Sequence, residues 1–557
     1  MRGAEASASA SAADSAAVVV DNDNNISYLS GLGLDLLDLV HAGPKTAATK
    51  RGRRFEDTKD FVDMPLLASS LGEVVDRLRS PSASTSAEAV LASCFGPPGS
   101  DLESAAPDDW SPAGGDPDDD DDDNDVLLLR RHIHGCWPAL CKRPLHPGGG
   151  GGGTTVLALP HKMFVPGSRF REQYYWDSYF VLQGLLASRM GTSALQLTEN
   201  LLHCVERYGF VPNGTRTYYL GRSQPPLLSE MVADLYRWSL DNEDDSVLPA
   251  GFLDGALPLL VREHEYWTKG DHLVRVGGRE LLRYHAGTTC PRPESYVEDR
   301  EATSSPGVYR EIATMAESGW DFSGRWLRDS KDLSTSRATR VVPVDLNTIV
   351  ARMEANVSLV AGALGREDVR REYELLSGRR FDSIDEVLWD EGSGQWKDLV
   401  LGEEEEEEEE VPRRCTTYAS NWLPLWRDRG LPPGRAEAAV ASLEASGLVL
   451  PGGLATSVQR TGHQWDYPNA WAPLQYLVHE GLTSSGGSRG RDLASKIAKN
   501  FLRNVHATLA STGQMHEKYD AEIPGQYGGG GEYIPQTGFG WTNGVVLSFL
   551  CKHETML

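Results

Sequence analysis

Apolar residues recur at helical spacing along most of this 557-residue chain, and the strict alternation typical of β-strands is rare. About ten segments show this pattern. One of them carries Leu493, Ile497, Phe501, Val505 and Leu509 on a single helical face. Irregular stretches rich in Gly, Pro, Trp and Tyr separate the segments, and no change of composition after residue 50 marks a linker. The pattern predicts one all-helical domain whose loops carry the unusual residues.

The charge of the chain is uneven. Its 80 acidic and 54 basic residues give a formal net charge of −26, but sixteen acidic residues lie in two runs, at 116–125 and 403–410. Such runs are typical of solvated insertions, and a surplus of negative charge repels polyanions. We therefore expect no nucleic-acid partner. The predicted organisation is a disordered Ala/Ser-rich leader at 1–30, followed by a single domain at 31–557 with low-complexity insertions at 112–125, 147–153 and 402–411.

The sequence carries few signs of targeting or of a cofactor. No stretch approaches the roughly 20 consecutive apolar residues of a membrane span, and the apolar run Ala16–Val20 is shorter than the core of a signal peptide. We expect no transmembrane span, and a cytoplasmic location by default. No nucleotide-binding loop, cofactor fingerprint or metal-ligand spacing occurs, so neither a cofactor nor a metal is expected.

Tryptophan stands directly before aspartate in three separate loops, at Trp176-Asp177, Trp320-Asp321 and Trp465-Asp466. Indole faces stack on the apolar C–H faces of pyranose rings, and carboxylates bind the hydroxyl groups around the rim. The alternative is that these aromatic residues only cover the ends of a helical core. Repetition of the pair in three loops favours a deep sugar-binding pocket.

Two longer motifs, at Pro166–Tyr179 and Gln464–Pro473, resemble the diagnostic motifs of trehalases of glycoside hydrolase family 37, in particular plant members. The resemblance covers roughly residues 135–548. Further matching blocks are Pro212–Gly214, Arg222–Pro226, Arg292–Tyr296, Glu317–Phe322, Val342–Asn347, Glu517–Asp520 and Gly528–Asn543. Ser168, where a glycine is expected, and the low-complexity runs depart from the family pattern.

The resemblance implies an (α/α)6 toroid, in which six inner and six outer helices alternate and loops at one end hold the active site. It also implies hydrolysis of α,α-trehalose to two glucose molecules with inversion, with trehalose as the small-molecule partner. We expect a monomer. Because plant members are often extracellular or membrane-anchored, the resemblance leaves an extracellular or plasma-membrane location open.

Inversion requires one carboxylic acid that protonates the leaving oxygen and one carboxylate that activates water. Asp321 matches the family's general acid, and its neighbours Trp320 and Phe322 are apolar groups of the kind that raises a carboxyl pKa. From the local sequence alone, Asp321 could instead cap a helix that starts at Phe322.

Glu517 matches the family's general base, and the neighbouring Lys518 would favour its ionised form. Without the family, this pair could be a solvated surface feature. Glu532 is the competing base; it follows the glycine run Gly528–Gly531, a candidate lid over the sugar.

The remaining matched positions bind the two glucosyl units in the family. They are Arg169, Trp176, Asp177, Asn213, Arg222, Ser223, Gln224, Arg292, Pro293, Glu294, Gly319 and Glu532. Arg222 and Arg292 could instead serve as buried ion-pair partners. Asn213 also begins a glycosylation sequon, and we expect it to be unmodified because a glycan would obstruct the pocket.

Two rival functions remain at the level of the sequence. One is another inverting toroidal glycosidase that acts on a different α-linked glucoside, and the other is a non-catalytic sugar sensor. The two nearly complete motifs argue against the first rival. The presence of both Asp321 and Glu517 argues against the second, because a binding module would be free to lose either residue.

Overall fold

A computed structural model describes residues 31–41, 55–79, 86–112, 125–145, 153–242, 247–402 and 416–553. The predicted leader at 1–30 lies outside these residues, as does most of each predicted insertion at 112–125, 147–153 and 402–411. In the part of the chain that is described, no helix has both the length and the hydrophobicity needed to cross a membrane.

Six elements form a closed inner ring in the described residues, each packed against two others. Most of their residues are buried on every side, as expected of helices inside a helical layer. In order around the ring they are α7 (Tyr175–Ala187), α9 (Leu228–Asp241), α13 (Val344–Ala363), the 3₁₀ helix η8 (Ala419–Leu425), α16 (Ala472–Ser485) and α18 (Gly540–Lys552).

The ring closes where α18 packs against α7. A Cβ atom at Gly184 would lie 2.5 Å from the Gly544 Cα, and one at Gly544 would collide with the backbone carbonyl of Phe180. Only glycine at these two positions allows the two backbones to approach so closely. The contact between α7 and α18 therefore depends directly on the sequence.

Six outer helices cover the ring. They are α5 (Asp125–His134), α8 (Gly191–Tyr208), α10 (Phe252–Thr268), α14 (Glu367–Ser383), α15 (Arg435–Ala445) and α17 (Gly487–Thr512). Each has one apolar face: α17 buries Leu493, Ile497, Phe501 and Val505, as its spacing predicts, and Leu509 is half-buried. The alternating inner and outer elements form the expected (α/α)6 toroid, so the predicted fold class is confirmed.

The remaining elements are short and lie in or between the loops. Helices α6 (Trp137–Leu140), α11 (Tyr296–Ala302) and α12 (Pro306–Glu317) lie in the connections between the helices of the toroid. All strand pairs are antiparallel. They are β1 (Leu102–Ser104), β2 (Cys141–Pro144) and β3 (Met163–Phe164) in one sheet, and the pairs β4 (Leu273–Val276) with β5 (Arg279–Leu282), β6 (Val341–Val342) with β9 (Leu399–Val400), β7 (Trp389–Asp390) with β8 (Gln395–Trp396), β10 (Val449–Leu450) with β11 (Gly453–Leu454), and β12 (Asn469–Trp471) with β13 (Lys518–Asp520).

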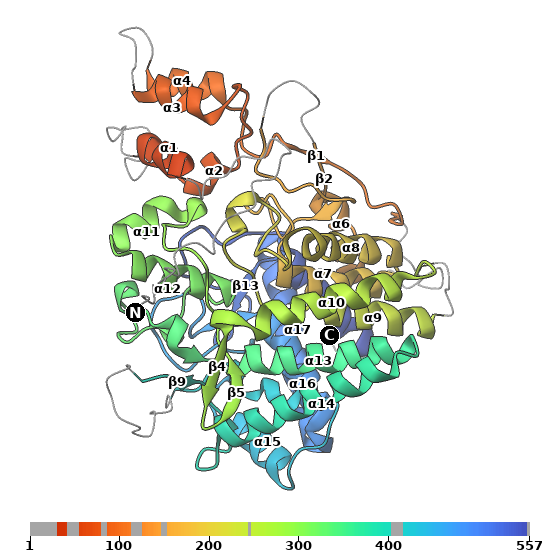
Figure 1. Ribbon diagram of the computed structural model, residues 1–557. Coiled ribbons are helices and arrows are strands. Elements are labelled where there is room, and N and C mark those ends of the chain that lie inside the picture. The colour runs from red at the N-terminus through yellow and green to blue at the C-terminus, as the bar shows by residue number, and fades with distance from the viewer. Residues whose placement is uncertain are drawn as a thin grey trace, which may run out of the picture.

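Four N-terminal helices build a second, smaller core. They are α1 (Gly31–His41), α2 (Thr58–Val62), α3 (Leu71–Arg79) and α4 (Ala87–Cys94). In Figure 1 these helices, drawn in red and orange, lie at one end of the molecule and α15 at the other. Their apolar residues pack on Tyr174, Tyr218, Tyr219 and Tyr296 of the toroid. The N-terminal helices are thus joined to the toroid by an aromatic surface.

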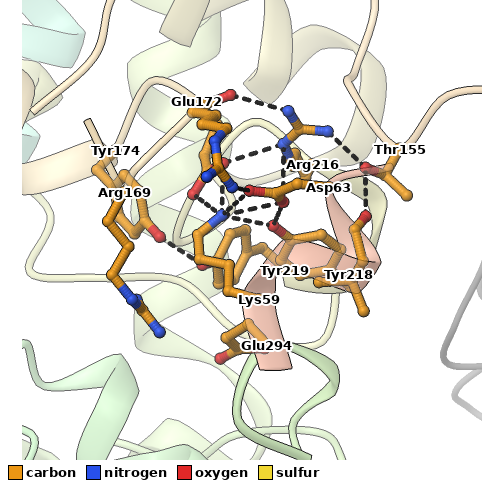
Figure 2. A network of polar contacts seen from close by, with 12 residues as sticks. Lys59, Asp63, Thr155, Arg169, Glu172, Tyr174, Arg216, Tyr218, Tyr219 and Glu294 are labelled. Atoms are coloured by element: carbon orange, nitrogen blue, oxygen red, sulfur yellow. Dashed lines mark hydrogen bonds and ion pairs between the residues drawn. The ribbon is translucent and has the colours of Figure 1, made fainter. Parts of the chain in front are cut away.

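A fully buried cluster of charges reinforces this junction (Figure 2). Lys59 of α2 places its Nζ 2.8 Å from Asp63 Oδ2 and 2.8 Å from Glu172 Oε1 in the loop before α7. Arg216 donates through Nε to Glu172 Oε2 at 3.0 Å. Burial opposes ionisation of Asp63, but the cations Arg216, Lys59 and Arg171 hold its pKa well below the ordinary value. Buried charges are tolerated only when paired in this way, so the cluster fixes α2 to the toroid.

We predict that Lys59→Met lowers the free energy of unfolding by about 3 kcal/mol, because Asp63 and Glu172 lose the cation that they share inside the protein. Urea titration of the variant and the wild type measures the difference. Lys269→Met is the matched control, since Lys269 is exposed and pairs with Glu265 on the surface of α10; it should leave stability nearly unchanged. Equal effects of the two substitutions would contradict a stabilising role of the buried cluster.

Candidate active site

A pocket opens where the first turns of several inner helices meet. Tyr174, Trp471 and Phe539 line it, and they are the N-cap residues of α7, α16 and α18. The toroid therefore directs three helix N-termini, with their partial positive charge, toward one cavity.

Most of the predicted site residues line this pocket. They are Arg169, Trp176, Asp177, Asn213, Arg222, Gln224, Arg292, Glu294, Gly319, Asp321 and Glu532. Ser223, Pro293 and Glu517 are buried and do not belong to the lining. The Ser223 hydroxyl donates to the Val211 carbonyl, and its N–H donates to Glu317 Oε1 at 3.1 Å, so this residue supports the loop that carries its neighbours.

Stacked indoles form one wall of the pocket. Trp465 and Trp471 have ring centroids 4.1 Å apart with nearly parallel planes, and Trp465 also stacks on Trp320 at 5.5 Å. Trp176 completes the wall at 5.7 Å from Trp465. Trp176, Trp465 and Trp471 reach the lining of the pocket, whereas Trp320 is buried behind Trp465 and does not.

A glycine turn after α12 presents Asp321. Gly319 has φ +74°, a conformation that disfavours other residues, and a Cβ atom there would come within 2.9 Å of the Trp176 ring. No helix starts at Phe322; the 3₁₀ turn that follows is capped by Ser323, whose hydroxyl accepts from the Arg325 N–H. The alternative that Asp321 is a helix cap is therefore wrong.

Burial raises the pKa of Asp321 to about 6, although the guanidinium groups of Arg292 and Arg222 oppose the shift. The side chain of Phe322 is buried beside it, and Trp320 is almost completely buried. Asp321 therefore keeps its proton to a higher pH than an exposed aspartate does.

Glu517, immediately before β13, is fully buried. Neither carboxylate oxygen accepts a hydrogen bond of good geometry from the described residues, and Lys518 Nζ lies 3.3 Å from Oε1. Burial raises the pKa of Glu517, and the Lys518 ammonium opposes the rise. Both residues are inaccessible to solvent, so the alternative of a solvated surface pair is wrong.

Gln464, the first residue of the second motif, connects the surroundings of the two carboxylates. Its Nε2 donates to the backbone carbonyl of Asp321, and its Oε1 accepts from Lys518 Nζ at 2.7 Å. Pairing of β12 with β13 brings this motif beside Glu517. Gln464 lines the pocket but was not among the predicted site residues; its position at the start of a diagnostic motif was the available signal.

The glycine-rich segment Gly528–Gly531 lies directly on this connection. Lys518 Nζ donates to the Gly530 carbonyl at 3.0 Å, and a Cβ atom at Gly531 would lie 2.6 Å from Gln464 Oε1. Glycine thus permits close approach of this backbone, as expected of a segment that covers a ligand.

Glu532 and Tyr533 follow the glycines and line the pocket. Both oxygens of Glu532 lie 3.3 Å from Arg292 Nη2. Burial raises the pKa of Glu532 to about 7, against the charge of Arg292. Burial also raises the pKa of the Tyr533 hydroxyl, and the negative charges of Glu517 and Asp321 add to the shift.

Arg222 and Arg292, which the sequence left open as sugar ligands or as buried ion-pair partners, are both paired and accessible from the pocket. Arg222 donates to Glu294 Oε1 at 2.6 Å and to Asn213 Oδ1 at 2.7 Å. Arg292 Nη2 donates to Asp299 Oδ1 at 2.7 Å. Each arginine is therefore an ion-pair partner and also part of the lining.

Other features of the site were not evident from the sequence. The side chains of Asn213 and Arg222 meet inside the protein, so the Asn213 amide is buried; that it is unmodified remains a prediction. Asp466 does not reach the pocket; it accepts from Ser323 Oγ at 2.9 Å and from the Gly324 N–H at 2.8 Å, and so holds the loop after Asp321. Trp465 and Trp471 line the pocket, as the second motif predicts, and the lining residues absent from the prediction are Pro166, Phe170, Tyr174, Tyr219, Ser295, Ala316, Gln464, Tyr533, Phe539 and Trp541.

The arrangement is suited to acid-base hydrolysis of a sugar. Asp321 is a carboxyl group whose proton is retained up to about pH 6. Glu517 is a second carboxyl group with unsatisfied acceptor atoms. Within the described residues, no group of three or more histidine, cysteine, aspartate or glutamate side chains is arranged to hold a metal ion.

Comparison with known proteins agrees with this site. A family model described as Trehalase matches residues 53–554. The probable trehalase of Oryza sativa subsp. japonica is 40% identical over 551 residues, which cover 92% of this chain and 95% of that protein. The trehalase of Arabidopsis thaliana is 40% identical over 75% of this chain and 68% of its own length, and that of Homo sapiens is 37% identical over 90% and 87%.

Among solved structures, neutral trehalase Nth1 from Saccharomyces cerevisiae superposes with a TM-score of 0.58 at 22% identity, covering 71% of this chain and 74% of that one. This likeness supports the toroidal fold. The family model and the relatives, which extend over nearly the whole chain, confirm the resemblance predicted from the motifs: the chain belongs to the trehalase family.

Proposed function

We propose that Asp321 is the general acid and Glu517 the general base with which this chain hydrolyses α,α-trehalose to two molecules of glucose. The observation that carries the proposal is the difference between the two buried carboxyl groups. Burial raises the pKa of both groups, that of Asp321 to about 6, but Glu517 lies 3.3 Å from the Lys518 ammonium, which favours its ionised form, and its oxygens accept no hydrogen bond of good geometry from the described residues. One group is suited to donate a proton and the other to accept one.

In this mechanism Asp321 protonates the oxygen between the two glucosyl units while the bond from that oxygen to the anomeric carbon breaks. The electron pair of the bond leaves with the oxygen, and one glucose departs as a neutral alcohol. Burial of Asp321 favours its protonated form until the leaving oxygen develops negative charge.

Glu517 removes a proton from the water that attacks the anomeric carbon on the opposite face. The new bond joins the water oxygen to this carbon, so its configuration inverts. Lys518 favours the ionised form that the base requires, although burial acts against it. Trp541 donates through Nε1 to the Glu517 carbonyl at 2.8 Å and so fixes the backbone of the base.

The surrounding polar groups bind sugar hydroxyls in this proposal. Arg169, Arg222 and Arg292 supply donors, and Asn213, Gln224 and Glu294 supply acceptors around the rim of the pocket. Trp176 and Trp471, which line the pocket, supply apolar contacts to the rings. The segment Gly528–Tyr533 excludes bulk water from the reacting atoms.

Glu532 is less suited to be the base, because burial raises its pKa to about 7, so it is mostly protonated at the pH at which Asp321 keeps its proton. We assign it to binding a glucose hydroxyl beside that guanidinium. A monomeric state and the lack of a nucleic-acid partner remain predictions.

Both catalytic assignments are tested by substitution. Asp321→Asn and Glu517→Gln should each lower kcat for trehalose by at least about 10³-fold, because each removes one proton transfer. Glu522→Gln is the control: this exposed carboxylate pairs with Arg460 on the surface and should change kcat by less than about twofold. Loss of activity in Glu532→Gln with near-normal activity in Glu517→Gln would overturn the choice of base.

Azide separates the two roles, because it attacks carbon without a base. Adding azide to Glu517→Ala should restore turnover and give β-glucosyl azide, since Asp321 can still protonate the leaving group. Asp321→Ala should not respond. Rescue of Glu532→Ala instead would identify Glu532 as the base.

The pKa shifts also predict the pH dependence of kcat/KM. Activity requires ionised Glu517 and protonated Asp321, so kcat/KM rises on the acidic side as Glu517 ionises and falls above about pH 6 as Asp321 loses its proton. Because the carboxyl groups of the site interact electrostatically, each measured midpoint describes the interacting groups together and not a single residue. A value of kcat/KM that continues to rise from pH 6 to about pH 8 would contradict the assignment of Asp321 as the acid.

A further inference from the structure

We propose that Asp57, at the start of the N-terminal helix α2, is a positioning residue of the active site that acts through Arg169. This inference rests on the proposed role of Arg169 in binding the sugar. It assigns a part of the site to a segment outside the toroid, where none of the predicted site residues lies.

Asp57 and Arg169 form a two-pronged ion pair. Arg169 Nε lies 2.5 Å from Asp57 Oδ2, and Nη2 lies 2.9 Å from Oδ1. Arg169 lines the pocket, and its side chain is only 13% exposed. A planar guanidinium held at two points by a carboxylate keeps a fixed orientation, and its remaining N–H groups then point in fixed directions.

The other side of Arg169 faces the segment that covers the pocket. The Arg169 guanidinium carbon lies 4.5 Å from the centre of the Tyr533 ring, and the backbone N–H of Arg169 donates to Gln536 Oε1 at 3.1 Å. The Ser168 hydroxyl donates to the same oxygen at 3.0 Å. Arg169 thus lies between α2 and the segment that covers the pocket. The orientation of its side chain therefore affects both the binding of the sugar and the position of the covering segment.

Asp57 is itself held in a fixed position. Asp57 is the N-cap of α2, where its Oδ1 accepts from the Lys59 N–H at 3.0 Å. Two residues further, the Lys59 side chain enters the buried charge cluster and pairs with Glu172, which follows Arg169 closely in the chain. Figure 2 shows this cluster, with the Arg169 side chain directed away from it. The cluster therefore fixes both ends of the pair between Asp57 and Arg169.

Such a support matters for the reaction because a free arginine loses side-chain entropy when it binds a ligand. An arginine that is already held in place loses less, so binding is tighter. Removing the Asp57 charge should therefore weaken trehalose binding more than it slows the chemical step.

Asp57→Asn is the most selective test. Asparagine caps a helix as well as aspartate does, so α2 is kept while the two-pronged pair with Arg169 is lost. We expect kcat/KM for trehalose to fall about 10- to 100-fold, mostly through a higher KM, with little change in Tm. Asp57→Glu should recover part of the loss, and Asp57→Ser, which also caps the helix, should reproduce it.

Asp60→Asn is the matched control on the same helix. Asp60 pairs with Arg171 Nη2 at 2.8 Å, and Arg171 does not line the pocket. This variant should keep kcat/KM within about twofold of the wild type. An equal loss in Asp60→Asn and Asp57→Asn would mean that the effect arises from a general loosening of α2, and it would overturn the positioning role.

A double-mutant cycle with Arg169→Ala distinguishes this inference from the proposed function. If Asp57 acts through Arg169, Asp57→Asn should cause no further loss in the Arg169→Ala background. A wild-type KM in Arg169→Ala would refute the proposed sugar-binding role of Arg169 itself. A raised KM in Arg169→Ala together with a normal KM in Asp57→Asn, or with fully additive losses, would refute only the positioning role of Asp57.

Discussion

The close contact between α7 and α18 is the packing interaction on which the site depends. Gly184 and Gly544 allow the two backbones to touch, and this contact closes the inner ring. The first turns of the same two helices carry Trp176 and Asp177 on one side and Trp541 on the other. A ring that failed to close would separate these walls of the pocket, so the geometry of the loops follows from the packing of the helices.

The site concentrates acidic groups inside the protein and compensates each of them differently. Burial dominates at Asp321 and raises its pKa to about 6. Lys518 partly offsets burial at Glu517, and Arg222 and Arg292 hold the pKa of Glu294 below its ordinary value despite burial. The same chemical group can therefore act as acid, base or ligand according to the cations around it. The basis of the mechanism is this distribution of charge, and the overall charge of the chain has little part in it.

The sequence predicted the helical layers and the pocket more completely than it predicted the connections between them. Helical spacing predicts a face such as that of α17, and the matching blocks Glu317–Phe322 and Glu517–Asp520 indicate Asp321 and Glu517 as candidate catalytic residues. The pairing of Lys59 with Glu172, or of Gln464 with Lys518, joins segments that are far apart in the chain, and no local pattern encodes it. Asp466 illustrates the limit, because its motif predicts a pocket residue whereas the structure uses it to hold the loop after Asp321.

The central claim, inversion by one acid and one base, is tested most directly by following the first glucose molecules released from trehalose in ¹⁸O-labelled water by NMR and mass spectrometry. The account predicts equal initial amounts of α- and β-glucose, with the label confined to the β anomer, because water attacks opposite the departing sugar. Release of two α anomers, or label in the α anomer before mutarotation, would contradict it.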